Sequence, residues 1–399
     1  VQVACSWQIS SSLYLTESGD VYRCDAMEED PISDYFLLDR STTGSGSLNS
    51  PQLIRTFTQQ RTLHKRRVIS IGCGSHHSIA LCQDGRVFSW GSGSSGALGH
   101  GDRSDQARPR EIAALGEHHV TSIAVGGQHT LFLCDTMSTS TFFREAEYQR
   151  KIYACGNNNE NQLALSKSSL LGKTKSKATQ STPRAIETLP KNFIPVSIHC
   201  GWDFSGAIGH SKKHLRSNSQ DKTQITNNNL EEQSKPRSKS RSKLRPKSRS
   251  SSESFSGSNS PEPTEESIMM NQPILKIVMW GRNSHGQCGI GIASTKVLTP
   301  KYVKQPWSDN LSVDDFSCGQ GHAMCVVAGE VYVWGSGENG QLGTHQVLSL
   351  EPEAIESIRF CDRNGMPASV VRVCAGPFHS VAVTTGGRVF TWGMNTMGA

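Results

Sequence analysis

Five copies of one short pattern constrain this chain more than any other feature: Trp-Gly, or Cys-Gly once, followed by Gly or Asn at two fixed positions. Gly and Asn are the residues that accept left-handed backbone at the least cost. The copies therefore predict a rigid turn, built five times, with left-handed backbone at both positions. Self-similarity of this kind is typical of a repeat architecture rather than of an enzyme active site. The turn residues are Gly91, Gly93, Gly96, Gly156, Asn158, Asn161, Gly281, Asn283, Gly286, Gly335, Gly337, Gly340, Gly393, Asn395 and Gly398.

Two copies also match the Gly-x-Gly-x-x-Gly fingerprint of dinucleotide-binding turns, at Gly91–Gly96 and Gly335–Gly340. A dinucleotide site needs a helix that opens at the turn, so that the helix N-terminus faces the pyrophosphate. The residues that follow, Ala97-Leu98-Gly99 and Gln341-Leu342-Gly343, are poor helix starts, and Asn replaces Gly in the sister copies. The pattern argues against nucleotide binding, and we expect no cofactor.

Each turn ends a longer unit that contains two strand patterns. The strand before the turn alternates β-branched and aromatic residues, as in Val331–Trp334. A tight turn such as Asp84-Gly85 joins it to an earlier strand, and a Gly-x-x-His step precedes that strand. Copies without large insertions are 52 and 57 residues apart, with no clean helical period inside them. Four strands per unit, closed in a ring as an all-β propeller, is the economical interpretation. The histidines of the step are His77, His129, His322 and His379.

The unit at 73–99 and 318–343 closely resembles the repeat of the regulator of chromosome condensation family, whose members fold as seven-bladed β-propellers. The resemblance covers 70–134, 150–208 and 274–399, and more weakly the degenerate first repeat at 1–25. Phe204 departs from the pattern where His is expected, and Cys155 where Trp is expected. Six hairpin cores stand where the family has seven, so we expect the ring to be incomplete and the intact protein to carry at least one further blade.

The remaining segments are a variable stretch and two insertions. Residues 26–67 begin acidic and are interpreted as a loop, and 68–399 hold the propeller repeats. The insertions at 135–150 and 210–272 both fall at the tight turn of their units, so we expect them to share one face, away from the rigid turns. Residues 210–272 are rich in Ser, Asn, Lys and Arg and poor in apolar residues, which predicts disorder.

A basic tract inside the second insertion carries Lys or Arg at every odd position: Lys235, Arg237, Lys239, Arg241, Lys243, Arg245, Lys247 and Arg249. Subtracting these eight charges from the formal net charge of +6 leaves about −2, so the folded body is not a broadly basic nucleic-acid-binding surface. The tract resembles a nuclear-import signal or an Arg/Ser segment, with a solvated basic loop as the alternative. Phosphorylation of its serines, or of Ser260 before Pro261, would cancel positive charge.

No apolar run approaches the roughly 18 residues of a membrane span, and no signal peptide is visible. We therefore expect a cytoplasmic or nuclear protein, or one present in both compartments. Its 12 cysteines form no Cys-x-x-Cys pair and are interpreted as buried thiols rather than disulfides.

The repeated histidines invite a metal interpretation that the spacing opposes. Zinc needs ligands within about 2.1 Å of one ion, whereas residues repeated once per blade are spread apart, so each His is interpreted as hydrogen-bonded to the adjacent turn in its blade. Cys73 with His76 forms the densest local cluster but lacks a third, orienting group. No catalytic and no metal residue is therefore predicted.

Two further positions have open interpretations. Asp203, beside Trp202 in the unit without the His, marks either a core variant or a binding edge. Trp307 lies outside the repeat pattern and is either an exposed contact residue or a side chain buried under a loop.

These features predict a non-enzymatic β-propeller that binds proteins through its loop-bearing faces. The family resemblance implies regulation of a small GTPase, as a guanine nucleotide exchange factor, which lowers nucleotide affinity without a catalytic residue. Family members also serve as a plant light receptor and as scaffolds beside ubiquitin-ligase or kinase domains, so a non-catalytic scaffold or adaptor is one alternative. A chromatin-associated protein that binds nucleic acid only through the basic tract is another. No membrane span and no small-molecule substrate are expected.

Overall fold

The computed structural model describes residues 2–5, 11–25, 56–64, 66–138, 147–165, 178–211, 273–356 and 359–395. The chain divides into two units, Val1–His210 with Leu275–Ala399, and Ser211–Ile274. The first unit holds the sheets described below. Nearly all of the second unit, with the basic tract and the predicted disorder, lies outside the described residues, as do Gly398 and the sites of predicted phosphorylation.

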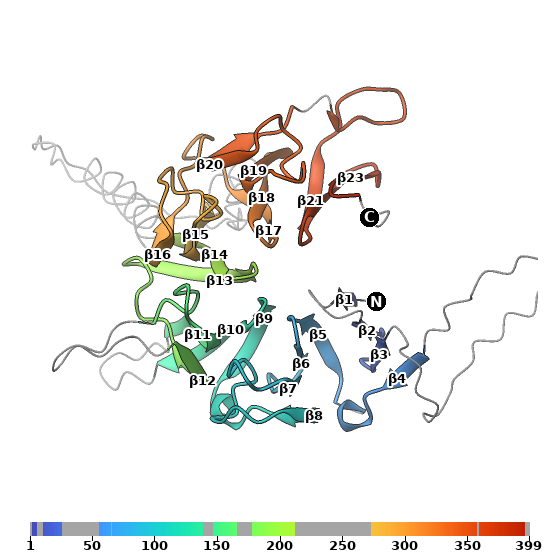
Figure 1. Cartoon of the computed structure of the whole chain (residues 1–399), viewed down its shortest axis with the longest axis vertical. Helices are drawn as coiled ribbons and strands as arrows, with labels where there is room; N and C mark the ends of the chain where they lie inside the picture. Colours follow the sequence, from blue (N-terminus) through green and yellow to red (C-terminus); the bar gives the residue numbers. More distant parts are fainter. Residues whose placement is uncertain are drawn as a thin grey trace, which may run out of the picture. The chain divides into compact units, whose positions relative to one another are not determined.

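The strands of the described residues form six antiparallel sheets, which we call blades 1 to 6 (Figure 1). Each blade is built from strands consecutive in the sequence. Blade 1 contains β1 (Gln2–Cys5), β2 (Ser11–Leu15), β3 (Val21–Asp25) and β4 (Thr56–Gln59). Blade 2 contains β5 (Val68–Cys73), β6 (His77–Cys82), β7 (Val87–Gly91) and β8 (Gln106–Glu111). Blade 3 contains β9 (His119–Val125), β10 (His129–Ser138), β11 (Glu147–Asn157) and β12 (Thr179–Ala185).

The remaining blades follow the same order. Blade 4 contains β13 (Phe193–Cys200), β14 (Phe204–Ser211), β15 (Lys276–Arg282) and β16 (Lys296–Tyr302). Blade 5 contains β17 (Val313–Cys318), β18 (His322–Val327), β19 (Glu330–Ser336) and β20 (Leu348–Ala354). Blade 6 contains β21 (Val370–Ala375), β22 (His379–Thr384) and β23 (Val389–Gly393). The helical turns η1 (Arg61–Leu63) and η2 (Ala113–Leu115) lie between blades along the chain, and the described residues contain no α-helix.

Successive blades pack through their first strands. Strand β1 contacts β5, and the same contact continues from β5 to β9, β9 to β13, β13 to β17 and β17 to β21. Four-stranded sheets that follow one another in this way form a β-propeller. The predicted all-β propeller with four-stranded blades is therefore confirmed, and six blades lie within the described residues.

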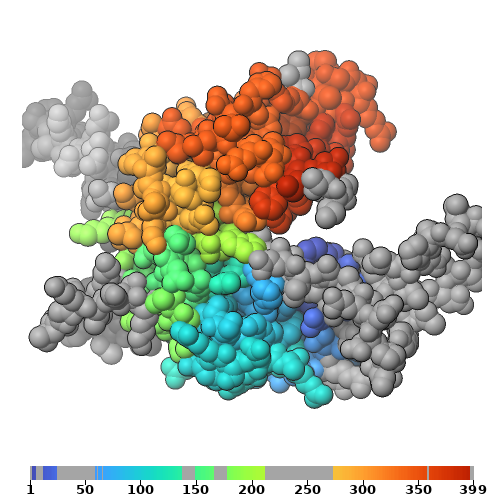
Figure 2. Space-filling view, viewed as in Figure 1, coloured from blue at the N-terminus to red at the C-terminus, as the bar shows by residue number. Residues whose placement is uncertain are grey.

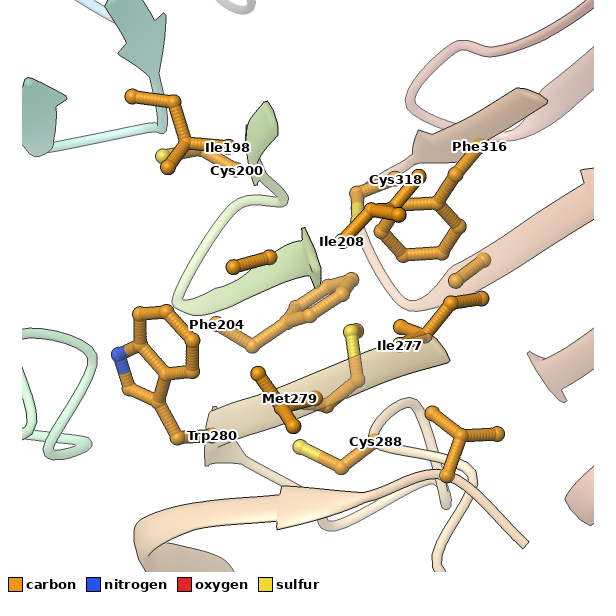
Figure 3. Close-up of a cluster of buried hydrophobic side chains, with 14 of the residues drawn as sticks. Ile198, Cys200, Phe204, Ile208, Ile277, Met279, Trp280, Cys288, Phe316 and Cys318 are labelled. Carbon is orange, nitrogen blue, oxygen red and sulfur yellow. The ribbon is translucent and has the colours of Figure 1, made fainter. Parts of the chain in front are cut away.

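Apolar side chains fill the space between neighbouring blades. Figure 3 shows this at blades 4 and 5, where Phe204 and Met279 are fully buried and Phe316 lies on the facing side. The indole of Trp334 stacks on Phe316, with ring centroids 5.9 Å apart. Burial of one such aromatic side chain stabilises the fold by about 2–3 kcal/mol.

Each outer strand of blades 2 to 5 carries one buried proline that lies three residues before a buried Ile or Val. In blade 2 this pair is Pro109 and Ile112, and the amide of Ile112 donates to the carbonyl of Val87 at 2.9 Å. Proline lacks an amide hydrogen, so it weakens the pairing of an edge strand with another chain. The other prolines are Pro183, Pro300 and Pro352.

Two predicted boundaries need correction. The range 26–67 is not only loop, because β4 (Thr56–Gln59) pairs with β3 and completes blade 1. The insertion at 135–150 is partly strand, because β10 and β11 extend their hairpin as far as the pair Ser138 and Glu147. An ion pair between Arg150 Nε and Asp135 Oδ1, at 3.1 Å, lies across this extension.

Both insertions join the second strand of a blade to its third, as predicted. In blade 4, Gly209 still pairs with Lys276, so β14 and β15 lie side by side although residues 212–275 separate them in the sequence. In Figure 2 the yellow-green part of the chain borders the orange part that follows the insertion.

Candidate functional site

Strand direction divides the connections between two faces. Because strands alternate in direction, the links from first to second strand and from third to fourth strand lie at one end of each sheet. We call this end the loop face, and it holds the Gly-x-x-His steps and the rigid turns. The links from second to third strand, with both insertions, lie at the opposite end.

Three of the four repeated histidines, His77, His129 and His322, join blades rather than bonding to the turn of their own blade, which corrects the prediction for them. His129 Nε2 in blade 3 lies 2.9 Å from Ser205 Oγ in blade 4. The hydroxyl of Ser205 donates to the carbonyl of Gln162 at 2.9 Å, so it accepts the proton that His129 carries on Nε2. The same contacts join His77 to Thr130 at 3.1 Å and His322 to Ser380 at 3.0 Å.

The carbonyl that accepts the hydrogen bond from the hydroxyl also accepts one from the tryptophan of the next blade. Gln162 accepts a bond from Trp280 Nε1 at 2.8 Å, and Gln341 accepts one from Trp392 Nε1 at 2.9 Å. Where Cys155 replaces Trp, its thiol lies 3.4 Å from the carbonyl of Ala97. We call this set of His, hydroxyl, carbonyl and Trp the inter-blade clasp.

Burial keeps the clasp histidines neutral. Desolvation lowers the pKa of His77 and His322 to about 4 and that of His129 to about 3, assisted by the neighbouring histidines. A neutral ring with its proton on Nε2 fits the geometry, since Nδ1 of His129 and of His322 has no partner in the described residues.

The glycine of each Gly-x-x-His step is required by the ring that lies on it. A Cβ on Gly126 would meet Cε1 of His129 at 2.1 Å, and one on Gly74 would meet Cε1 of His77 at 2.2 Å. In blade 4 the ring of Phe204 lies on Gly201 in the same way. The backbone here is not left-handed, so the constraint is steric contact rather than φ.

The rigid turns are left-handed at one of the two predicted positions. The later position has a positive φ, 75° at Gly96 and 64° at Asn161, and so do Gly286 and Gly340. The earlier position has none, so the prediction is wrong for Gly93, Asn158, Asn283, Gly337 and Asn395. The glycine directly after Trp or Cys is left-handed instead, as at Gly91, Gly156, Gly281, Gly335 and Gly393.

The earlier position selects Gly or Asn for other reasons. A Cβ on Gly93 would lie 2.2 Å from the carbonyl oxygen of Ser104. Asn158 is buried, and its side-chain oxygen accepts the amide of Leu163 at 3.0 Å. In the same way, the side-chain oxygen of Asn283 accepts the amide of Cys288 at 3.0 Å. Local contacts, rather than left-handed backbone, explain this position.

One junction replaces the polar part of the clasp with apolar groups. Phe204 of blade 4 stands where His is expected, and Ala323 of blade 5 stands where the hydroxyl is expected. Both side chains are fully buried. A His opposite Ala323 would lack its acceptor, so the two departures compensate each other.

The loop tips between glycine and histidine carry side chains that differ from blade to blade. They are Ser75-His76, Gly127-Gln128, Trp202-Asp203, Gln320-Gly321 and Pro377-Phe378. Backbone bonds connect the tips: Ser75 donates to the carbonyl of Gly127 at 2.8 Å, and Gly127 donates to that of Trp202 at 3.0 Å. The loop face therefore presents varied side chains on one repeated backbone.

Trp202 and Asp203 lie on the loop face where blades 3 and 4 meet, and both are partly buried. A Cβ on Gly127 would lie 3.0 Å from the indole of Trp202. Burial raises the pKa of Asp203 although Arg282 acts in the opposite direction. Asp203 is therefore a surface group held in a dry environment, which favours the binding-edge interpretation.

Trp307 is buried, with 8% of its surface exposed. Its indole packs on Tyr332, with ring centroids 4.8 Å apart. Of the two interpretations, burial is correct.

Most of the thiols lie in the interior of the fold. Nine of the 12 cysteines are buried and all 12 are unpaired. Burial raises the pKa of the Cys73 thiol to about 11, so it is not a thiolate near neutral pH. The described residues contain no group of three or more potential metal ligands. They also contain no helix that is long and apolar enough to cross a membrane.

Sequence reasoning missed Gln162, Gln287 and Gln341, whose carbonyls receive the Trp of the next blade. Their side chains brace the turn, as when Gln341 Oε1 accepts the amide of Asn339 at 2.8 Å. The recurrence of Gln at one position in three of the turns was the available signal.

Comparison with known proteins agrees with this architecture. The regulator of chromosome condensation (RCC1) repeat matches residues 84–133, 151–208, 277–326 and 328–383. A second form of this repeat matches 68–97 and 370–399. Together these ranges cover more than half of the chain.

Individual relatives are distant. The ultraviolet-B receptor UVR8 of Arabidopsis thaliana is 24% identical over 339 residues, which are 84% of this chain and 67% of the receptor. The human E3 ubiquitin-protein ligase HERC2 is 24% identical over 98% of this chain, which spans 6% of the ligase. The crystal structure of Prp20p from Saccharomyces cerevisiae superposes with a TM-score of 0.57 at 18% identity, over 98% of this chain and 71% of Prp20p. At this identity the structural likeness shows the fold alone.

Proposed function

Because this chain belongs to the regulator of chromosome condensation (RCC1) repeat family, we propose that it acts by binding another protein through its loop face. The observation that carries the proposal is the contrast between the repeated clasp and the varied loop tips. A rigid scaffold that presents different side chains at equivalent loops is typical of a binding surface. The buried thiols and neutral histidines support binding rather than catalysis.

The partner that we propose is a small GTPase, and the effect is faster release of its bound nucleotide. Two points support this choice. The family resemblance implies exchange activity, and the structure of Prp20p was determined together with its binding properties toward Gsp1p and histones. Exchange needs no acid or base on this chain. A protein that binds the nucleotide-free GTPase more tightly than the nucleotide-bound GTPase lowers the affinity of the GTPase for nucleotide by the same factor.

Release of fluorescent GDP from a panel of purified small GTPases tests the proposal. We expect release from at least one GTPase to accelerate by about 10-fold or more, equivalent to roughly 1.4 kcal/mol. Binding to a GTPase without acceleration would overturn exchange and favour the scaffold alternative. If no GTPase of the panel binds and none releases its nucleotide faster, the choice of partner is overturned.

A further inference from the structure

The loop tip of blade 4 differs from its counterparts in both size and charge. Among the five described tips that follow the glycine of the step, only Trp202-Asp203 combines an aromatic side chain with a carboxylate. The equivalents of Trp202 are Ser75, Gly127, Gln320 and Pro377.

The backbone contacts between blades at this position do not depend on either side chain. The backbone of Trp202 accepts a hydrogen bond from Gly127 and donates one to Gly319 at 3.3 Å. Gln320 makes an equivalent backbone contact with Pro377 at 3.4 Å. The architecture therefore accepts Ser, Gly, Gln or Pro here, so the repeat itself does not call for an indole and a carboxylate.

The side chain of Asp203 is mostly removed from solvent, and its polar contacts within the described residues are long. Its side chain is 18% exposed, and its oxygens lie 3.3 Å from Gln162 Nε2 and 3.7 Å from Arg282 Nη1. Arg282 is held back by a bond from its Nε to Ser284 Oγ at 3.0 Å. A charge-assisted bond between guanidinium and carboxylate is ordinarily about 2.7–2.9 Å long.

Within the described residues, the positive group that pairs with the carboxylate is Arg282, at the long distance of 3.7 Å. Burial raises the pKa of Asp203, Arg282 opposes this rise through its charge and a hydrogen bond, and the nearby charge of Glu160 adds to it. Lys296 is already engaged, 3.5 Å from Glu160 Oε2 and bonded to the carbonyl of Asn159. A cation that reached Asp203 from outside would complete the pairing.

We propose that Trp202 and Asp203 form a docking point for one arginine side chain of the partner protein, and this rests on the proposed function. The guanidinium pairs with the Asp203 carboxylate and lies against the indole of Trp202. Arginine fits better than lysine because its plane is weakly hydrated, stacks on aromatic faces and offers paired N–H donors. A partly buried Trp beside a desolvated carboxylate is the composition expected of an interface hot spot.

A titration of isotope-labelled protein with N-acetyl-arginine amide, followed by NMR, tests the point without a known partner. We expect the Trp202 indole N–H signal to shift and to saturate at millimolar to tens of millimolar ligand. N-acetyl-citrulline amide, which has the same shape without the charge, should leave the signal unchanged. Asp203→Asn should abolish the shift, and Glu338→Gln, at an exposed acid of the loop face, should preserve it. No saturable shift in the wild type, or an equal shift with citrulline, would overturn the docking point.

A second measurement uses any GTPase that binds in the panel. We expect Trp202→Ala and Asp203→Asn each to weaken binding by about 10-fold or more, whereas Gln320→Ala, at the position equivalent to Trp202, changes it less than about 2-fold. Thermal unfolding of each variant checks that the fold is intact. If the wild type binds and these variants bind equally well, the docking point is wrong and the proposed function stands. If the wild type binds no GTPase, the choice of partner fails independently of the arginine titration.

Discussion

The Nε2 atom of His129 in blade 3 lies 2.9 Å from the hydroxyl oxygen of Ser205 in blade 4. These residues are 76 positions apart, and neither belongs to the other's repeat. The fold is therefore held by contacts that each repeat makes with the next one, as well as by those within each blade. Phe204 and Ala323 show that an apolar pair can replace the polar one when both positions change together.

The first prediction concerns this compensation. Ser205→Ala should destabilise the fold by about 1–3 kcal/mol, because the buried Nε2 proton of His129 loses its acceptor. His129→Phe alone should cost a similar amount, since the hydroxyl of Ser205 loses its donor. The loss of unfolding free energy in the double variant should be about 1 kcal/mol smaller than the sum of the losses in the two single variants. Urea unfolding of the four proteins measures the coupling, and strict additivity would contradict the clasp.

The second prediction is the pH dependence of stability. His77, His129 and His322 have folded-state pKa values lowered to about 4, 3 and 4, and an unfolded histidine titrates near 6.5. The unfolded chain therefore binds more protons between these values, so the free energy of unfolding should fall as pH drops from about 6.5 toward 4. Urea midpoints at half-unit pH intervals measure the fall. The His129→Phe, Ser205→Ala double variant should fall less steeply, and a slope equal to that of the wild type would contradict this role for His129.

The third prediction separates the two kinds of glycine in one turn. Gly340 has a φ of 76° and open space where a Cβ would lie, and its counterpart Asn161 has a φ of 64°. Gly340→Asn should therefore change stability by less than about 1 kcal/mol. Gly335 has a φ of 100°, and a Cβ there would lie 2.4 Å from the carbonyl oxygen of Gly321. Gly335→Asn should cost more than about 3 kcal/mol or prevent folding. Equal thermal unfolding temperatures for the two variants would contradict the assignment.

The fourth prediction concerns the tryptophan of the clasp. Trp334→Phe removes the bond from Nε1 to the Gln287 carbonyl, at 2.9 Å, and leaves a void beside Phe316. The loss should be about 2–4 kcal/mol by calorimetry. Trp202→Phe, on the loop face, should cost less than about 1 kcal/mol and serves as the control. A larger loss of stability in the control than in the Trp334 variant would contradict the assignment of Trp334 to the core.

Much of the fold was predictable because the repeat encodes it locally. The positive φ at Gly96, the tight turn at Gly85 and the alternation of Val331–Trp334 depend on neighbouring residues, so the sequence displays them directly. Strand β4 was missed because Thr56–Gln59 carries no turn pattern beside it.

The site was less predictable because its contacts cross from one repeat to the next. Phe204 stood out in the sequence, but its compensating partner Ala323 lies one repeat away and looks ordinary alone. Trp307 could not be placed, because it lies in the connection between blades 4 and 5 and its burial depends on Tyr332, 25 residues later in β19. Asn158 was misinterpreted because the same residue type serves left-handed backbone at one site and side-chain bracing at another.

The most direct test of the account is the affinity of this protein for one small GTPase in two states, measured by titration calorimetry with the nucleotide-free and the GDP-bound forms. The account predicts at least about 10-fold tighter binding to the nucleotide-free form, and an equal fall in the GTPase's affinity for GDP when this protein is bound. Equal affinity for the two forms, or no association with either form of any GTPase in the panel, would contradict it.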